Sequence, residues 1–242
     1  PALLSVSTNL QLFETNLVVV RVGDVAQTLT LNGNSIFLDQ FDITGNYVNT
    51  VNLPDDGASA MVTMGWDNIT GVNNGTTTGT SLTRSLDGRY MVVAGYNTNL
   101  NYGAILYTST SANVPRGIGL INSHAQYTLP VASTDSAFNN TYWRAGITDG
   151  TNNFWGIGGV GGTYYLGFDA SFVQVQNVFG NSRSMGLFNG NIYCSTASSP
   201  TGILKIDGMP TNAVTPTVLF NGSSGNYDMT VSPDGNLIYV AD

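Results

Sequence analysis

Apolar residues occur along this chain in short runs, and most runs are bounded by Gly, Asn, Asp or Ser. Examples are the runs LVVVRV, YMVVAGY, NIYCST and GILKI. Short runs rich in β-branched and aromatic residues and bounded by turn residues are typical of strands rather than helices. The pattern therefore predicts an all-β fold with many short strands.

Four segments repeat one plan: a short strand, a turn with Asp-Gly or Asn-Gly, and an apolar strand. The segments are residues 81–96, 142–159, 182–198 and 227–242, and their turn glycines are Gly88, Gly150, Gly190 and Gly235. The glycines are separated by 62, 40 and 45 residues. A period of about 40–50 residues is typical of β-propeller blades. Asp-Gly and Asn-Gly also favour type I′ hairpin turns, because both positions tolerate positive φ.

The runs between the repeats complete four-stranded antiparallel blades. We expect one propeller domain over residues 1–242, with a partial blade at 16–54, blades at about 81–135, 142–180 and 182–220, a partial blade at 227–242, and a long loop at 55–79. The first partial blade lacks a first strand, and the last stops after its second strand. We therefore expect a truncated part of a ring of six to eight blades.

Two segments resemble a known repeat. The sequence TVSPDGNLIYVAD at 230–242 and, more weakly, RSLDGRYMVVAGY at 84–96 are similar to the repeat of YVTN-type and related WD-like β-propellers. The opening of the chain is also similar to secreted, functionally uncharacterised bacterial propeller proteins. The resemblance implies a propeller fold and, more weakly, an extracellular setting. It supplies no catalytic motif, and propellers perform many unrelated functions.

Composition narrows the class of partner. The formal net charge of −8 argues against nucleic acid and against anionic membrane surfaces. No segment approaches the ~20 apolar residues of a membrane span.

The chain has 27 Asn, 28 Thr and 20 Ser but only one Lys, which favours an extracellular or cell-surface location. It begins without Met, so we expect a processed chain or a fragment. The only cysteine, Cys194, lies in an apolar run and is expected to be buried.

Three of the six arginines lie in predicted first strands, which border the central channel of a propeller. Arg84, Arg144 and Arg183 precede the Asp or Asn of the turn by three, five and six residues. Guanidinium groups suit carboxylate or phosphate, so one hypothesis is an anion site at a channel mouth. The alternative is that each Arg bonds strand-end carbonyls or an Asp of the next blade. The unequal offsets weaken the idea of a ring, since side chains alternate between faces.

Other candidate residues are fewer. Trp66, in the long loop, is the best candidate for an exposed contact residue. Sequons at Asn68, Asn74, Asn139 and Asn221 permit N-glycosylation. We expect no metal and no cofactor: Asp55, Asp56 and Asp67 have no EF-hand spacing, and His124 is the only histidine.

The favoured function is therefore a non-catalytic, secreted binding or scaffold module in an extracellular assembly. Its partner would be a glycan, another protein, or copies of itself joined through open blade edges. The alternative is an extracellular propeller enzyme, a hydrolase or lyase, with its site at the channel mouth. No catalytic residue can be selected from the sequence.

Overall fold

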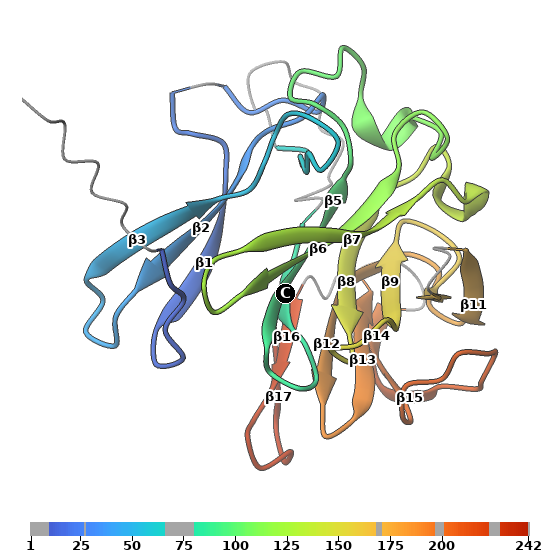
Figure 1. Ribbon diagram of the computed structural model, residues 1–242. Coiled ribbons are helices and arrows are strands. Elements are labelled where there is room, and N and C mark those ends of the chain that lie inside the picture. The colour runs from blue at the N-terminus through green and yellow to red at the C-terminus, as the bar shows by residue number, and fades with distance from the viewer. Residues whose placement is uncertain are drawn as a thin grey trace, which may run out of the picture.

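The strands form five separate antiparallel sheets that follow one another along the chain (Figure 1). This computed structural model describes residues 10–26, 28–65, 80–167, 171–196, 201–222 and 228–241. The first sheet contains β1 (Leu17–Val22), β2 (Ile36–Phe41) and β3 (Tyr47–Asn52). The last contains β16 (Asp228–Val231) and β17 (Ile238–Ala241).

The three sheets between them have four strands each, in the order in which the strands occur in the chain. The second sheet contains β4 (Leu82–Arg84), β5 (Tyr90–Tyr96), β6 (Arg116–Asn122) and β7 (Tyr127–Ser133). The third contains β8 (Trp143–Thr148), β9 (Phe154–Gly158), β10 (Thr163–Leu166) and β11 (Phe172–Gln176). The fourth contains β12 (Ser182–Phe188), β13 (Asn191–Thr196), β14 (Thr201–Ile206) and β15 (Thr217–Gly222). Two short 3-10 helices, η1 (Leu106–Thr108) and η2 (Ser136–Phe138), lie in connections.

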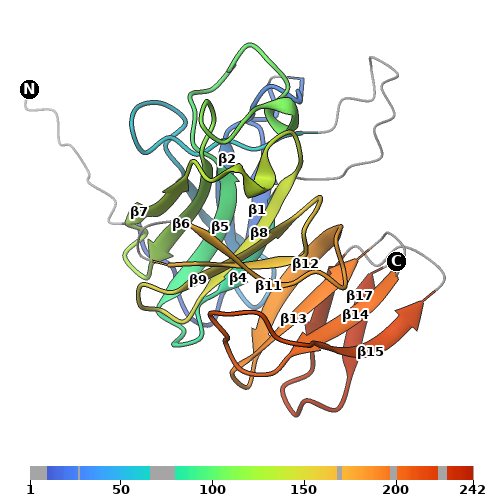
Figure 2. The same ribbon diagram turned by 90° about the vertical axis from the view of Figure 1, so that its right-hand side faces the viewer.

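These sheets are propeller blades. Each four-stranded sheet is an antiparallel meander, and successive sheets stack face to face (Figure 2). Buried side chains of neighbouring sheets form shared clusters; one, for example, joins Ile147 of β8 and Trp155 of β9 to Ile192 of β13. The prediction of an all-β propeller fold with four-stranded antiparallel blades is confirmed. The count of six to eight blades for a complete ring, and the grouping of all sheets into one domain, stay predictions.

In the first sheet, β1 runs in the same direction as β5, which is the second strand of the second blade. Leu17 and Val18 lie beside the β4–β5 turn, where β5 begins. At the other end, Asn34, just before β2, bridges Thr63, and Val62 bridges Tyr96, the last residue of β5. β1 and β5 therefore run the same way. Among the described residues, no strand pairs with β1 on the side away from β2.

Two patterns of side-chain hydrogen bonds in turns each recur in two of the described hairpins. In the β4–β5 turn the Ser85 hydroxyl donates to Asp87 and accepts from the Tyr90 amide; Ser232, Asp234 and Leu237 repeat these bonds between β16 and β17. In the β2–β3 turn Asp42 accepts from the amide and hydroxyl of Thr44. Asp149 accepts the same pair of bonds from Thr151 between β8 and β9.

The expectation of type I′ turns is correct at only one place. Asn189 and Gly190 both have positive φ, 46° and 71°, and join β12 to β13 in a two-residue turn. At the Asp-Gly turns only the glycine has positive φ. There the aspartate side chain bonds the turn backbone and stabilises a longer loop, which is why the type I′ prediction is wrong for these turns.

Large aromatic side chains fill the space between the second and third blades. The Phe138 ring packs edge-on against Trp143 and Phe172, at centroid distances of 4.9 and 5.2 Å. Cys194 is completely buried, as expected. The core also holds a charge: Arg116 is 0% exposed and donates to the carbonyl oxygens of Ser109, Val114 and Phe138.

Candidate functional site

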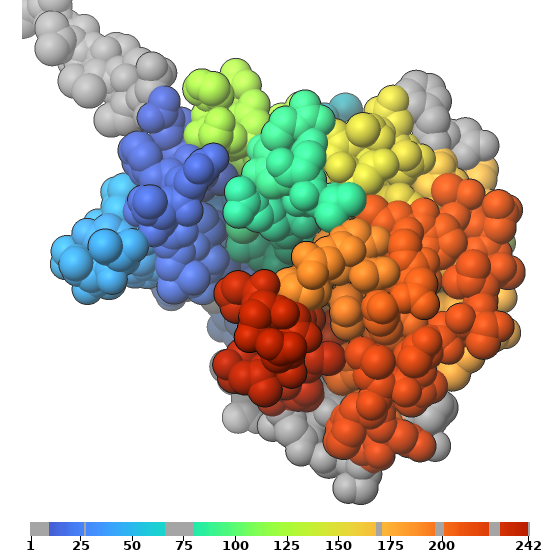
Figure 3. Space-filling model, turned by 90° about the horizontal axis from the view of Figure 1, so that it is seen from below, coloured from blue at the N-terminus to red at the C-terminus, as the bar shows by residue number. Residues whose placement is uncertain are grey.

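The inner strands of all five sheets border one central cavity of about 850 Å³. Seen from below, β1, the β4–β5 hairpin, β12 and the β16–β17 hairpin meet around the middle of the molecule (Figure 3). The cavity is lined by residues 18–20, 80–84, 91, 144, 183–187 and 228–230. Arg84, Arg144 and Arg183 are all among them, so the structure brings the three arginines to one cavity. Their binding of a ligand stays a prediction.

The arginines lie at two levels along this cavity. The Ser81 amide donates to the Arg144 carbonyl at 3.1 Å, so Ser81 and Arg144 are level on neighbouring inner strands. Arg84 follows three residues later on β4, which corresponds to about 10 Å along a strand. Arg144 bonds the backbone of Ser182, which places Arg183 near the Arg144 level. The offsets from the turn therefore report depth along the cavity.

Arg144 and Arg183 each lie at a β-bulge. The β8–β9 register shifts between Trp143 and Ala145, so Arg144 is an extra residue. The β12–β13 register shifts between Ser182 and Met185, around Arg183 and Ser184. The corresponding pairs β4–β5 and β16–β17 have no shift. Bulges re-aim side chains and occur often beside functional sites. A bulge also interrupts the strict alternation of side chains along a strand, on which the argument from unequal offsets depends.

Arg144 is held firmly at its level. Its side chain is almost completely buried, with 2% of the residue exposed. Nη1 donates to Asn181 Oδ1 at 2.7 Å and to the Ser182 carbonyl at 2.9 Å, and the guanidinium lies 4.7 Å from the centroid of the Tyr142 ring. These contacts join the third blade to the start of the fourth. Arg144 therefore also has the structural role that the alternative hypothesis gave it.

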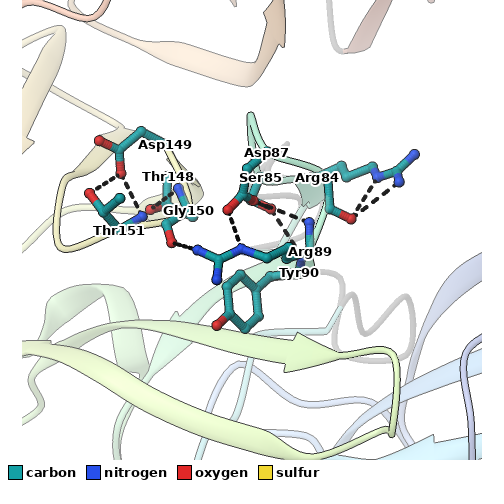
Figure 4. Close-up of polar contacts among 10 residues, drawn as sticks. Arg84, Ser85, Asp87, Arg89, Tyr90, Thr148, Asp149, Gly150 and Thr151 are labelled. Carbon is teal, nitrogen blue, oxygen red and sulfur yellow. Dashed lines mark hydrogen bonds and ion pairs between the residues drawn. The ribbon is translucent and has the colours of Figure 1, made fainter.

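Arg84 stands at the opposite end, near solvent. Its guanidinium donates from Nε and Nη2 to the Gly88 carbonyl, at 3.2 and 3.1 Å. It thus bonds a carbonyl of its own hairpin and points away from Arg89 (Figure 4). Arg89 contacts Asp87 and donates from Nη2 to the Gly150 carbonyl of the next blade at 2.6 Å. Partial burial would raise the pKa of Asp87, but hydrogen bonds from Ser85 and Arg89 hold it below its usual value.

A second cavity of about 610 Å³ lies beside the β4–β5 hairpin, between the segment before β1 and the β6–β7 turn. It shares Val18, Arg84 and Met91 with the central cavity. His124 lines it from the β6–β7 turn and is exposed, as expected for a loop histidine. Arg84 thus stands between the two cavities.

The remaining predicted residues are distributed over the chain. Trp66, Asn68, Asn74 and Asp67 lie outside the described residues. Asn139 is half-buried, and its Oδ1 accepts from the Ser111 amide at 2.6 Å. Asn221 is exposed in β15. Glycosylation of any of these stays a prediction.

The aspartates considered as metal ligands bond neighbouring residues. Asp55 accepts a bond from Ser35 at 2.5 Å, and Asp56 bonds the Gly57 amide. Within the described part of the chain, no three His, Cys, Asp or Glu residues gather as a metal site. No helix among these residues is long and apolar enough to cross a membrane.

One lining residue was missed by the sequence analysis. Asp228 is the only carboxylate among the described residues of the central cavity. It precedes the turn residue Asp234 by six residues, the same offset as Arg183 before Asn189. That shared offset was a usable signal, because it places both side chains at the start of an inner strand. The described lining thus contains three cationic groups and one anionic group.

Comparisons with known proteins identify no relative by sequence. A scan against models of protein families finds no match, and a search of curated proteins finds none. The chain is similar in structure to puromycin hydrolase, with 9% identity and a TM-score of 0.42, over 87% of this chain and 29% of that chain. It is also similar to a chain in the mitotic checkpoint complex, with 11% identity and a TM-score of 0.43, over 95% and 73%. It thus spans less than a third of the puromycin hydrolase chain. Because both TM-scores are low, the fold assignment rests on the sheets themselves.

Proposed function

We propose that this protein is a non-catalytic binding module of the propeller type, and that it holds an anionic group of its partner in the central cavity. The observation that carries the proposal is the arrival of Arg84, Arg144 and Arg183 from three successive blades at one cavity. The chain as a whole is acidic, with a formal net charge of −8, so this cationic cavity is a local reversal of sign. Guanidinium groups bind carboxylates and phosphates through paired hydrogen bonds, and partial exclusion of water strengthens such contacts.

The setting that we propose is extracellular or at the cell surface, where the module acts as a scaffold. The composition supports this setting: the chain is rich in Asn, Thr and Ser and has only one lysine. Exposed apolar side chains at the later sheets support a partner protein, a glycan or a second copy of the chain. Phe220 on β15 is 52% exposed and Tyr239 on β17 is 57% exposed. Open strand edges favour such pairing.

The alternative is a propeller hydrolase or lyase at the channel mouth. Acid–base catalysis on glycosides uses two carboxyl groups at a defined separation. The described lining holds one carboxylate, Asp228, beside three guanidinium groups. That composition suits the holding of an anion better than proton transfer, so we place binding first.

The test is isothermal titration of the protein with acetate, phosphate, sulfate and glucuronate. We expect weak, saturable binding of at least one anion, and a loss of at least tenfold in affinity in Arg183→Met. Arg21→Met is the matched control, because Arg21 pairs with Asp39 outside the cavity. The proposal fails if no anion binds, or if Arg183→Met binds as tightly as the control. Turnover of an acidic glycoside or ester by the natural protein would favour the enzyme instead.

A further inference from the structure

β1 is an edge strand that faces the central cavity. It lies at the end of its sheet, paired only with β2 among the described strands. Residues 18–20 line the cavity, and Leu17 and Val19 are 63% and 42% exposed. In an antiparallel pair, every second residue directs its N–H and C=O away from the partner strand. Among the described residues, none pairs with the inner side of β1, so this side offers open backbone groups along about 20 Å of strand.

The neighbouring blades indicate what fits this edge. In the second, third and fourth sheets, a first strand lies between the cavity and the second strand. β1 has the direction of the second strand of a blade, as β5 has, but no first strand separates it from the cavity among the described residues. An added strand would run antiparallel to β1 and would occupy the position that β4, β8 and β12 occupy in their own blades. An edge of this kind is a template for strand addition.

The arginines near β1 favour an added strand that carries negative charge. Arg84 lies at the Leu17 end of β1, since Val18 and Arg84 line both cavities together. Arg144 and Arg183 lie about 10 Å further along the inner strands, as the pairing of Ser81 with Arg144 indicates. A strand laid on β1 would therefore pass cationic groups at two levels.

We propose that the central cavity accepts an extended acidic segment of a partner protein, which pairs antiparallel with β1 and places carboxylates on the arginines. The C-terminal half of the segment lies beside Arg84, and the N-terminal half lies beside Arg144 and Arg183. Acidic residues four positions apart share one face and span about 13 Å, which covers both levels. This inference rests on the proposed function, because it identifies the chemistry of the partner at the same site.

The probe is a dye-labelled heptapeptide, Asp-Val-Thr-Val-Asp-Val-Thr, measured by fluorescence polarisation. Two matched peptides separate the two sources of affinity: one has both Asp replaced by Asn, and one is N-methylated at alternate backbone amides. We expect each change to weaken binding at least tenfold, because the first removes the carboxylates and the second removes the strand pairing. Arg183→Met should weaken the parent peptide tenfold and leave the Asn peptide unchanged.

Hydrogen exchange of the β1 amides distinguishes strand pairing from purely electrostatic binding, because only strand pairing protects these amides. We expect every second amide of residues 18–22 to exchange quickly in the free protein and at least tenfold more slowly with the parent peptide. Equal binding of the N-methylated peptide would overturn the strand model. So would amides of β1 that are already protected in the free protein, because another part of the polypeptide would then cover the edge. Binding of small anions without binding of any peptide would overturn this inference and leave the proposed function standing; failure of both would overturn both.

Discussion

Arg144 on the third blade donates a hydrogen bond from Nη1 to the backbone carbonyl of Ser182, 2.9 Å away at the start of the fourth blade. This bond spans two blades at the level where Arg183 enters the central cavity. It ties the geometry of the cavity to the packing of the blades. Substitution of Arg144 should therefore affect the stability of the fold.

Arg144→Met should lower the free energy of unfolding by about 2 kcal/mol, because Asn181 Oδ1 and the Ser182 carbonyl lose a charged donor. Arg183→Met should weaken binding of an acidic ligand at least tenfold, because Arg183 lines the central cavity. Urea unfolding of both variants, followed by tryptophan fluorescence, checks the first statement. An unfolding free energy of Arg144→Met equal to that of the natural protein would contradict the structural role of Arg144.

Arg116 should tolerate no conservative replacement. Its guanidinium is completely buried and donates to Ser109, Val114 and Phe138, while burial lowers its pKa. Arg116→Lys keeps the charge but supplies fewer donors, so we expect a loss of about 3 kcal/mol in unfolding free energy. Arg21→Lys, at a partly exposed ion pair with Asp39, should cost less than about 1 kcal/mol. Similar losses in the two variants would show that the buried network is not needed.

Cys194 should be inert in the folded protein. Burial raises the pKa of its thiol to about 12, and its Sγ lies 3.5 Å from the Thr163 hydroxyl. At pH 8 the thiolate is therefore scarce, and reagents cannot reach it. Iodoacetamide followed by mass spectrometry should label Cys194 only after urea is added. Rapid labelling without denaturant would contradict the buried position.

The β2–β3 turn should make stability sensitive to acid. Hydrogen bonds from Thr44 and Asn46 lower the pKa of Asp42 to about 2. Because this pKa lies below the unfolded value of about 3.9, the stabilisation is complete above that value and is lost as pH falls toward 2. The stability difference between the natural protein and Asp42→Asn should therefore shrink between pH 5 and pH 2. A difference that does not change with pH would contradict the role of the charged carboxylate.

Much of the fold could be predicted from local pattern, because each hairpin carries its own signal. Turn glycines such as Gly88 and Gly235 have the positive φ that their Asp-Gly sequences suggest. The bulges at Arg144 and Arg183 could not be predicted, because one extra residue leaves the apolar pattern nearly unchanged. The burial of Arg116 also left no sequence signal. Its partners are mainly backbone carbonyls, whose positions depend on how distant segments pack.

The candidate site was predicted in part. The three arginines were identified from their place before the turns, and the structure brings them to one cavity. The sequence does not indicate their two levels, because unequal offsets along alternating strands argue against a shared site. Asp228 has the same offset before its turn as Arg183, so this offset is the sequence signal that identifies it.

The most direct test of the central cavity as a binding site is an NMR titration that follows the Nε–Hε signals of the six arginines. The acidic heptapeptide is added to labelled protein in steps. The account predicts saturable shifts for Arg84, Arg144 and Arg183, with Arg21, Arg89 and Arg116 as internal controls that stay in place. Shifts confined to the three control arginines, or no shifts at any arginine, would contradict it.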